Sequence, residues 1–133
     1  MINIQVRTKF NRIPVITAEI RPTVSQVVRK TAHDIEADVK AEMRDEKHGR
    51  TYGTHQASAP GEAPAVDTGL LINSIQVEEV TDLTSSVGTP VEYAATLEFG
   101  SSRIAPRPIW VRTVEKAGKP FIAALTFVLS RLK

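Results

Sequence analysis

The sequence contains no cysteine and few aromatic residues: one Trp, two Tyr and four Phe in 133 residues. Without cysteine there is no disulfide, no thiolate metal ligand and no thiol nucleophile, which suits a reducing compartment. No run of about 18 apolar residues occurs, so the sequence predicts no membrane-spanning helix. The first five residues lack the charged and then apolar form of a signal peptide, so we expect the protein in the cytoplasm of the cell that makes it.

A chain of 133 residues suffices for one modest core, and we expect a single domain over residues 1–133. The net charge of +2 is too small to indicate nucleic-acid binding by itself. Residues 62–102 carry seven acidic side chains and no Lys or Arg, whereas residues 103–133 carry seven basic side chains and one acid. These two stretches can pair within one fold or between neighbouring copies in a ring.

The first third of the chain predicts a strand and then a long helix. A period-two pattern predicts a strand with one buried face, carried by Ile2, Ile4 and Val6. From Val24 to Met43, apolar residues recur at steps of three and four between charged ones, and Thr23 with Gln26 suits a capping box. Pro22 disfavours helix at the preceding residue, so the apolar pattern upstream is either a separate turn or a kinked extension of this helix.

Residues 47–66 form a polar loop in which the apolar pattern stops and glycines and prolines appear. A structureless connection of about 20 residues is unusual inside a compact domain and is normally functional or disordered. Its first half is basic and partly aromatic, with Arg50, Tyr52 and His55 as candidate contacts to a partner. We expect the loop to be mobile in the isolated protein and to become ordered against a partner, at a cost of about 1–2 kcal/mol per residue fixed.

The loop ends in the stretch Ala65–Ile75, which predicts a short turn of helix. Asp67 is the expected N-cap, because its carboxylate can accept hydrogen bonds from free backbone N–H groups at a helix start. Gly69 lacks a Cβ and therefore tolerates an unusual backbone angle or a close neighbour. Leu70 then supplies the first apolar side chain after the loop.

The next segment predicts a hairpin and a second short helix. Apolar and polar residues alternate over residues 75–80, and a return strand over 85–88 follows a turn at 81–83. Thr89, Pro90 and Glu92 together predict a helix start, with a capping Thr, Pro at the first helical position and Glu three residues after the cap. Gly100 lies where a left-handed C-cap residue belongs.

The last part of the chain predicts an extended passage and a C-terminal helix. The prolines at 106 and 108 force extended backbone through Arg107, so its guanidinium should be presented rather than buried in a helix. An apolar stripe over residues 121–132 then has helical spacing. We expect it to pack on the long first helix; the alternative is an amphipathic surface that awaits a partner.

No catalytic constellation is evident. His33 and Asp34 are adjacent and point about 100° apart on a helix, so they do not readily share a metal ion. His48 and His55 lie in the loop without a fixed carboxylate, and no nucleophile with a base or phosphate-binding Gly-rich turn is present. The prediction is a protein that is not an enzyme and holds no cofactor or metal; a small hydrolase is the most distant alternative.

A DNA-contacting accessory protein is the nearer alternative. Trp110 could stack on a base, and the phosphates could be met by Arg103, Arg107 and Arg112. The small number of aromatic residues and the acidic middle of the chain weigh against this reading, because the acids would repel a nucleic-acid backbone.

Three ordered blocks between about residue 57 and residue 110 resemble the head–tail joining or tail-completion (neck) proteins of long-tailed DNA phages. The first block is the small-residue and proline loop 57–64 with Val66-Asp67-Thr68-Gly69-Leu70-Leu71 and Ser74-Ile75. The second is Val87-Gly88-Thr89, Tyr93-Ala94 and Leu97-Glu98-Phe99-Gly100. The third is Ala105, Arg107-Pro108 and Trp110. The chain departs from the pattern at Leu71-Ile72, where relatives often carry a basic residue nearby, and at Gly118-Lys119-Pro120.

The resemblance implies a non-enzymatic virion protein that assembles as a ring, commonly sixfold, in the neck. Its partners would be copies of itself, the head connector or adaptor, and the tail tube or tail terminator, with DNA in the channel as a further contact and no membrane. It would lie in the virion neck or tail, and in the host cytoplasm during assembly. The positions that the resemblance marks for assembly or folding are Asp67, Gly69, Leu70, Glu98, Phe99, Gly100, Arg107 and Pro108.

The predicted fold class is α+β. A long N-terminal helix and a C-terminal helix pack on a small antiparallel hairpin-based sheet, and one long mobile loop interrupts the chain.

Overall fold

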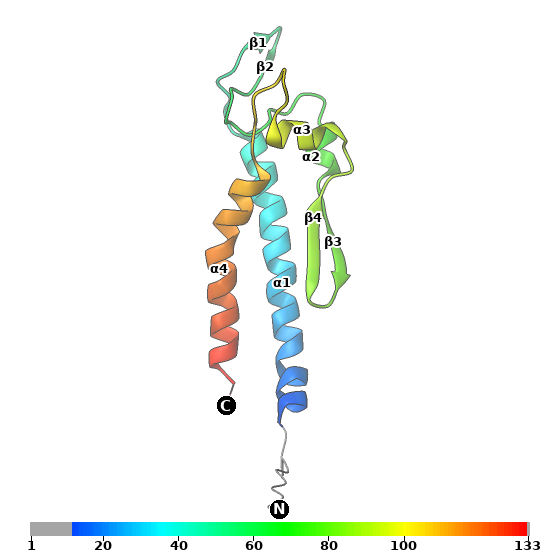
Figure 1. Cartoon of the computed structure of the whole chain (residues 1–133), viewed down its shortest axis with the longest axis vertical. Coiled ribbons are helices and arrows are strands. Elements are labelled where there is room, and N and C mark those ends of the chain that lie inside the picture. The colour runs from blue at the N-terminus through cyan, green and yellow to red at the C-terminus, as the bar shows by residue number, and fades with distance from the viewer. Residues whose placement is uncertain (1–11, 133) are drawn as a thin grey trace, which may run out of the picture.

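The computed structural model describes residues 12–132. These residues have the predicted mixed α+β fold, in which a long helix α1 (Ile13–Arg44) and a C-terminal helix α4 (Trp110–Ser130) run side by side (Figure 1). Two small antiparallel sheets and two short helices complete this part of the chain. The N-terminal strand predicted over residues 2–6 lies outside the described residues.

Helix α1 runs without interruption through Pro22, so the apolar pattern upstream of this proline is an extension of the helix and not a separate turn. The helix starts at Ile13 with a proline in its first turn, and the capping box predicted at Thr23 is therefore wrong. Ion pairs brace the first half of α1 against strand β3 (Gln76–Thr81) and the turn that follows it: in that turn, Asp82 lies 3.4 Å from Arg21 Nε. The second pair joins Arg29 Nε to Glu79 at 3.3 Å.

The larger sheet is the predicted hairpin, with β3 (Gln76–Thr81) antiparallel to β4 (Thr84–Gly88). Val77 pairs with Val87, and a bulge interrupts the register between Glu79 and Thr81. The hairpin contacts α1, and Figure 1 shows it on the side of α1 opposite to α4.

The smaller sheet lies inside the long loop, where β1 (Thr51–Tyr52) pairs with β2 (His55–Gln56). Gly53 has a φ of 61° in the turn between them, a conformation that a glycine adopts without a Cβ clash. The loop of residues 47–66 therefore contains secondary structure that the sequence pattern did not predict. Its mobility stays a prediction.

The short helices α2 (Leu70–Ser74) and α3 (Tyr93–Phe99) cover the end of α1. Helix α3 begins four residues after Thr89, so the helix start predicted there is wrong. The Thr89 hydroxyl accepts a hydrogen bond from the backbone N–H of Val91 (3.1 Å) and shares another with the Ser74 hydroxyl (2.6 Å). Thr89 thus ties the beginning of α3 to the end of α2.

The apolar core lies at one end of α1. Its buried members are Val39, Met43, Ala63, Ile72, Ile75 and Ile109. We call this part of the molecule the core end (residues 39–76 and 89–113) and the remainder the shaft (residues 13–38, 77–88 and 114–130). Of the fully buried side chains in residues 12–132, only Ser25 and Ala32 belong to the shaft.

The C-terminal stripe packs on α1 as expected, but its burial is incomplete. Phe121, Leu125 and Val128 are half-buried, whereas Ile122 and Leu129 are 64% and 52% exposed. The two helices therefore cover only one side of the stripe and leave a second apolar side facing solvent.

The acidic and basic stretches pair through α1. From the basic stretch, Arg112 Nη2 lies 3.3 Å from Glu42, and Lys116 Nζ lies 3.3 Å from Asp38. From the acidic stretch, the hairpin residues Glu79 and Asp82 pair with two arginines of α1. In the part of the chain that the structure describes, no ion pair joins the two stretches directly.

Candidate functional site

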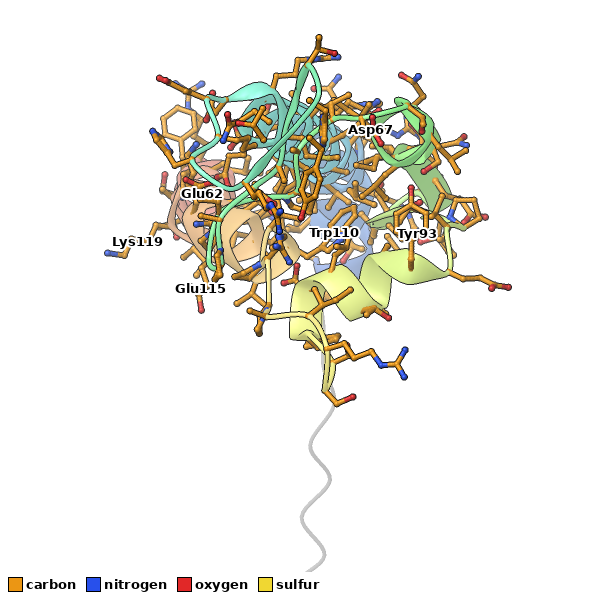
Figure 2. All side chains as sticks on the ribbon, turned by 90° about the horizontal axis from the view of Figure 1, so that it is seen from above. Glu62, Asp67, Tyr93, Trp110, Glu115 and Lys119 are labelled. Carbon is orange, nitrogen blue, oxygen red and sulfur yellow. The ribbon has the colours of Figure 1, made fainter. Side chains whose placement is uncertain are left out.

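The three blocks of the phage-like pattern meet at the core end. The first block supplies α2 and the turn before it, the second supplies α3, and the third leads into α4. In Figure 2, which looks down on this end, Asp67 and Tyr93 lie to one side of Trp110 and Glu62 to the other. The candidate site is therefore one continuous surface made of segments that are far apart in the sequence.

Glu98 joins α3 to α4. Its carboxylate is buried and accepts three backbone hydrogen bonds, from Ile109 (2.8 Å), Trp110 (3.1 Å) and Val111 (3.0 Å). A helix start has free N–H groups and a positive dipole end, and both favour a carboxylate there. Glu98 thus caps α4 from another helix, which fixes where α4 begins relative to α3.

Gly100 ends α3 with a φ of 76° and a ψ of −178°. The positive φ agrees with the prediction, but the residue is extended in ψ and not in the left-handed helical region. A Cβ at this position would lie 2.8 Å from Pro106 Cδ and 2.9 Å from the Ile104 carbonyl oxygen. The turn after α3 therefore requires glycine, and it leaves Phe99 76% exposed.

Asp67 does not cap α2, which is a correction of the sequence prediction. The N-cap residue is Gly69, with a φ of 82°, and the free N–H of Leu70 donates to the Thr68 hydroxyl at 3.3 Å. The positive φ of Gly69 turns the chain so that the Asp67 side chain stays 72% exposed, with His55 Nδ1 at 4.0 Å.

Arg107 lies outside any helix, as its flanking prolines predicted, and is half-buried, but its guanidinium is engaged within the chain and not presented to a partner. Its Nε and Nη2 both donate to the Ser58 carbonyl at 3.3 Å, and Nη1 donates to the Ala105 carbonyl at 3.1 Å. The backbone N–H of Arg107 also donates to the Leu97 carbonyl. The passage through Pro108 contains no helix or strand, and it places Arg107 beside Ser58 of the long loop.

Glu62 fastens the other side of that loop. Its carboxylate accepts backbone hydrogen bonds from Ala59 (2.7 Å) and His48 (3.1 Å), and its second oxygen lies 2.6 Å from the His48 ring nitrogen Nδ1. These contacts lower the pKa of Glu62 from 4.5 to about 2, and the hydrogen bond from the Ala59 N–H contributes most to this change. In the sequence, Glu62 is only one of seven acids in its stretch. Its contact partners Ala59 and His48 lie 3 and 14 residues before it, and no local pattern predicts these contacts.

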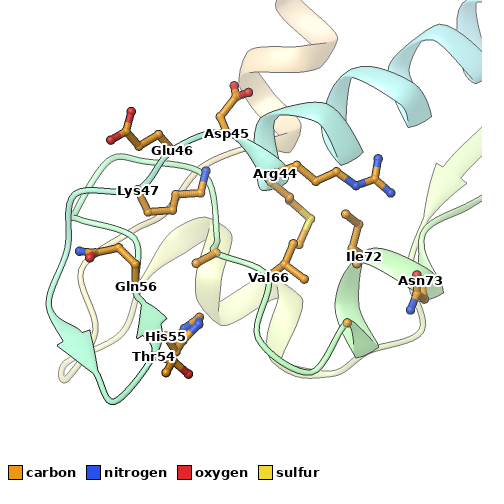
Figure 3. A pocket seen from close by; sticks show the side chains of 13 residues that line it. Arg44, Asp45, Glu46, Lys47, Thr54, His55, Gln56, Val66, Ile72 and Asn73 are labelled. Atoms are coloured by element: carbon orange, nitrogen blue, oxygen red, sulfur yellow. The ribbon is translucent and has the colours of Figure 1, made fainter.

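The loop candidates Arg50, Tyr52 and His55 lie on the β1–β2 hairpin and at its edge. Arg50 stacks over the Tyr52 ring with its guanidinium carbon 5.3 Å from the ring centre. His55 lines a mixed polar and apolar pocket of about 790 Å³ between the hairpin, the end of α1 and α2, with Val66 and Asn73 on its far side (Figure 3).

The arginine cluster proposed for DNA contact is dispersed. Arg107 holds Ser58, and Arg112 pairs with Glu42 and also donates to the Gly61 carbonyl at 3.2 Å. Trp110 is half-buried against the core. Of the three arginines, only Arg103 has neither a side-chain hydrogen bond nor an ion pair within residues 12–132.

Two further observations concern metal ions and membranes. In the described range, no group of three or more His, Cys, Asp or Glu side chains is placed to hold a metal ion. None of the helices described in residues 12–132 combines the length and the apolar character needed to cross a membrane.

Comparison with protein-family models, with curated proteins and with solved structures finds no match for this chain. The resemblance to the phage neck proteins therefore stands on its three sequence blocks.

Proposed function

We propose that this chain is a non-enzymatic structural protein of the phage particle that completes the tail or joins head and tail by forming a ring in the neck. The observation that carries the proposal is the amount of apolar surface that one copy leaves uncovered. At the core end the exposed large apolar side chains include Leu70, Tyr93 and Phe99, and along the shaft they include Val114, Ile122, Phe127 and Leu129.

Such a surface favours an assembly subunit. Fully burying one large apolar side chain stabilises an assembly by about 1.5–3 kcal/mol, so neighbours that cover several of them provide a strong drive for association. Large exposed apolar patches mark interaction surfaces in soluble proteins. Head-to-tail contacts between identical subunits close into rings when the rotation between neighbours permits it.

The three ordered sequence blocks are the reason for proposing the phage neck and not another ring-forming assembly. In the ring we expect copies of this chain to contact the head connector or adaptor on one side and the tail tube or its terminator on the other. The DNA-contacting alternative is less favoured, because Arg107 and Arg112 are occupied within the chain.

The test is deletion of the coding region in the parent phage or prophage, followed by electron microscopy of the induced lysate. We expect DNA-filled heads beside separate tails or tails of abnormal length, and restoration of complete particles when the protein is supplied from a plasmid. Intact infectious particles in the deletion lysate would refute the neck function.

A further inference from the structure

Phe99 forms an exposed apolar projection on a fixed support. It is 76% exposed at the end of α3, and Ile104, 39% exposed, lies in the turn that follows. Backbone hydrogen bonds hold this turn: Gly100 donates to Thr96 at 2.8 Å and Ser101 donates to Ile104 at 2.8 Å. A large aromatic side chain that is both exposed and held in place loses little conformational entropy when it enters a partner.

An apolar pocket lies on the other side of α3. It has a volume of about 390 Å³ between α1, α2 and α3, and its walls include Met43, Leu71 and Leu97. Leu70 and Tyr93 also line it and are 58% and 45% exposed, so the pocket has an apolar rim that faces solvent. This pocket matches an inserted hydrophobic side chain better than a polar ligand.

The projection and the pocket cannot meet within one copy. Tyr93 and Leu97 are four residues apart and share a face of α3, whereas Phe99 follows Leu97 by two residues and points about 200° away around the helix. A contact between two different surfaces of the same protein is heterologous, the type that generates rings.

The charges beside the two surfaces are opposite. Arg103 lies in the turn next to Phe99, and its side chain has no ion-pair partner in the described part of the chain. At the pocket, Asp67 is 72% exposed, and Glu92 directly precedes Tyr93 and is also exposed. Complementary charges of this kind orient an interface and suppress wrong pairings.

We propose that Phe99 of one copy inserts into the pocket beneath Leu70 and Tyr93 of the next copy, with Arg103 facing Asp67 and Glu92. This inference deepens the ring function proposed above and rests on it. We expect the pocket to be occupied by a second copy of this chain, because the chain itself carries both the apolar projection of Phe99 and the complementary charge of Arg103.

The first test is Phe99→Ala, with Val80→Ala as the control, since Val80 is a 56% exposed apolar residue on the β3–β4 hairpin, away from Phe99 and the pocket. Sedimentation across a concentration series should show self-association of the original protein. Truncation of a central aromatic anchor should weaken that association by at least about 30-fold, whereas Val80→Ala should leave it unchanged. Because Phe99 is exposed, both variants should retain the original melting temperature. Equal association of the Phe99 variant and the original protein, or a strictly monomeric original protein, would overturn the contact.

The second test uses the absence of native cysteine. Leu70→Cys in one tagged protein and Ser102→Cys in another place a single thiol beside the pocket and beside the projection. Oxidation of an equimolar mixture should give the mixed disulfide well above the roughly twofold excess over either homodimer that random pairing produces, and Phe99→Ala in the Ser102→Cys protein should bring the ratio back to that random value. A statistical mixture of the three dimers contradicts the proposed geometry.

Complementation separates this contact from the neck function. If the deletion lysate lacks complete particles and plasmid-borne Phe99→Ala restores them, the neck function stands and the Phe99 contact is refuted. If deletion leaves infectious particles, the neck function itself fails. Loss of particles with Phe99→Ala but not with Val80→Ala supports both.

Discussion

At the core end, α1 and α4 meet across a buried apolar cluster and beside a buried carboxylate, whereas along the shaft the same two helices meet through half-exposed side chains and surface ion pairs. Burial of apolar groups and charged hydrogen bonds away from water are large contributions to stability, and exposed ion pairs contribute about 0–1 kcal/mol each. Most of the buried contacts of residues 12–132 therefore lie at the core end, while the shaft has apolar surface left for an assembly to cover.

The largest effect that tests this comparison is expected from Glu98→Ala. The substitution leaves three N–H groups at the start of α4 without their carboxylate, and we expect a loss of about 4 kcal/mol in the free energy of unfolding. Urea denaturation followed by circular dichroism measures it. Glu98→Gln keeps the shape and part of the hydrogen bonding and should fall in between; a loss below about 1 kcal/mol for the alanine variant would contradict the cap.

The same substitution made in both regions gives the next largest effect. Ile75→Ala opens a cavity in the core end and should cost about 3 kcal/mol. Ile122→Ala removes a side chain that is 64% exposed and should cost less than about 0.5 kcal/mol in the isolated protein. Equal losses from the two variants, measured by urea denaturation, would mean that the shaft is as closely packed as the core end.

Arg107→Ala should have a smaller effect, about 1–2 kcal/mol, because it removes three hydrogen bonds from a half-buried guanidinium. The loop around Ser58 then loses a tether, so dilute protease should cut residues 49–62 faster than in the original protein. Arg103→Ala is the control with an exposed arginine. The idea fails if the two variants are cleaved at the same rate and have equal stability.

The smallest effect is the pH dependence contributed by Glu62. Its pKa in the folded protein is lowered to about 2 from 4.5, so its contribution to stability is fully present above pH 4.5 and is lost as the pH falls toward 2. Denaturation at a series of pH values should give a flatter curve for Glu62→Gln than for the original protein over this window. Parallel curves would show that the contacts of Glu62 do not stabilise the fold.

Sequence patterns predicted the elements that repeat regularly. The three- and four-residue spacing from Val24 to Met43 predicted most of α1, and the alternation around Val77 and Val87 predicted the β3–β4 hairpin. These predictions succeeded because side-chain periodicity follows directly from backbone geometry. Helix starts were predicted less well, because Thr89 and Asp67 have the right chemistry for a cap but are used for other contacts or left exposed.

The connections at the candidate site were beyond sequence reasoning. Glu98 was selected only through the resemblance, and Arg107 also through its flanking prolines and as a candidate DNA contact; neither the cap on α4 nor the hydrogen bonds to Ser58 were predicted. Both contacts join residues that are 11 or more positions apart, so no local spacing encodes them. The exposure of Phe99 likewise depends on which side of α3 packs on the rest of the molecule. A helix of seven residues is too short for its sequence pattern to predict that side.

The cap that Glu98 places on α4 also has a mechanical consequence. A helix of 21 residues is about 31 Å long, and the N–H groups at its beginning are held by the Glu98 carboxylate of α3. If α4 follows α3 as a rigid rod, a tilt of about 5° at α3 displaces the far end of α4 by about 3 Å. A neighbour that presses on Phe99 would therefore displace the far end of α4 by more than it displaces α3.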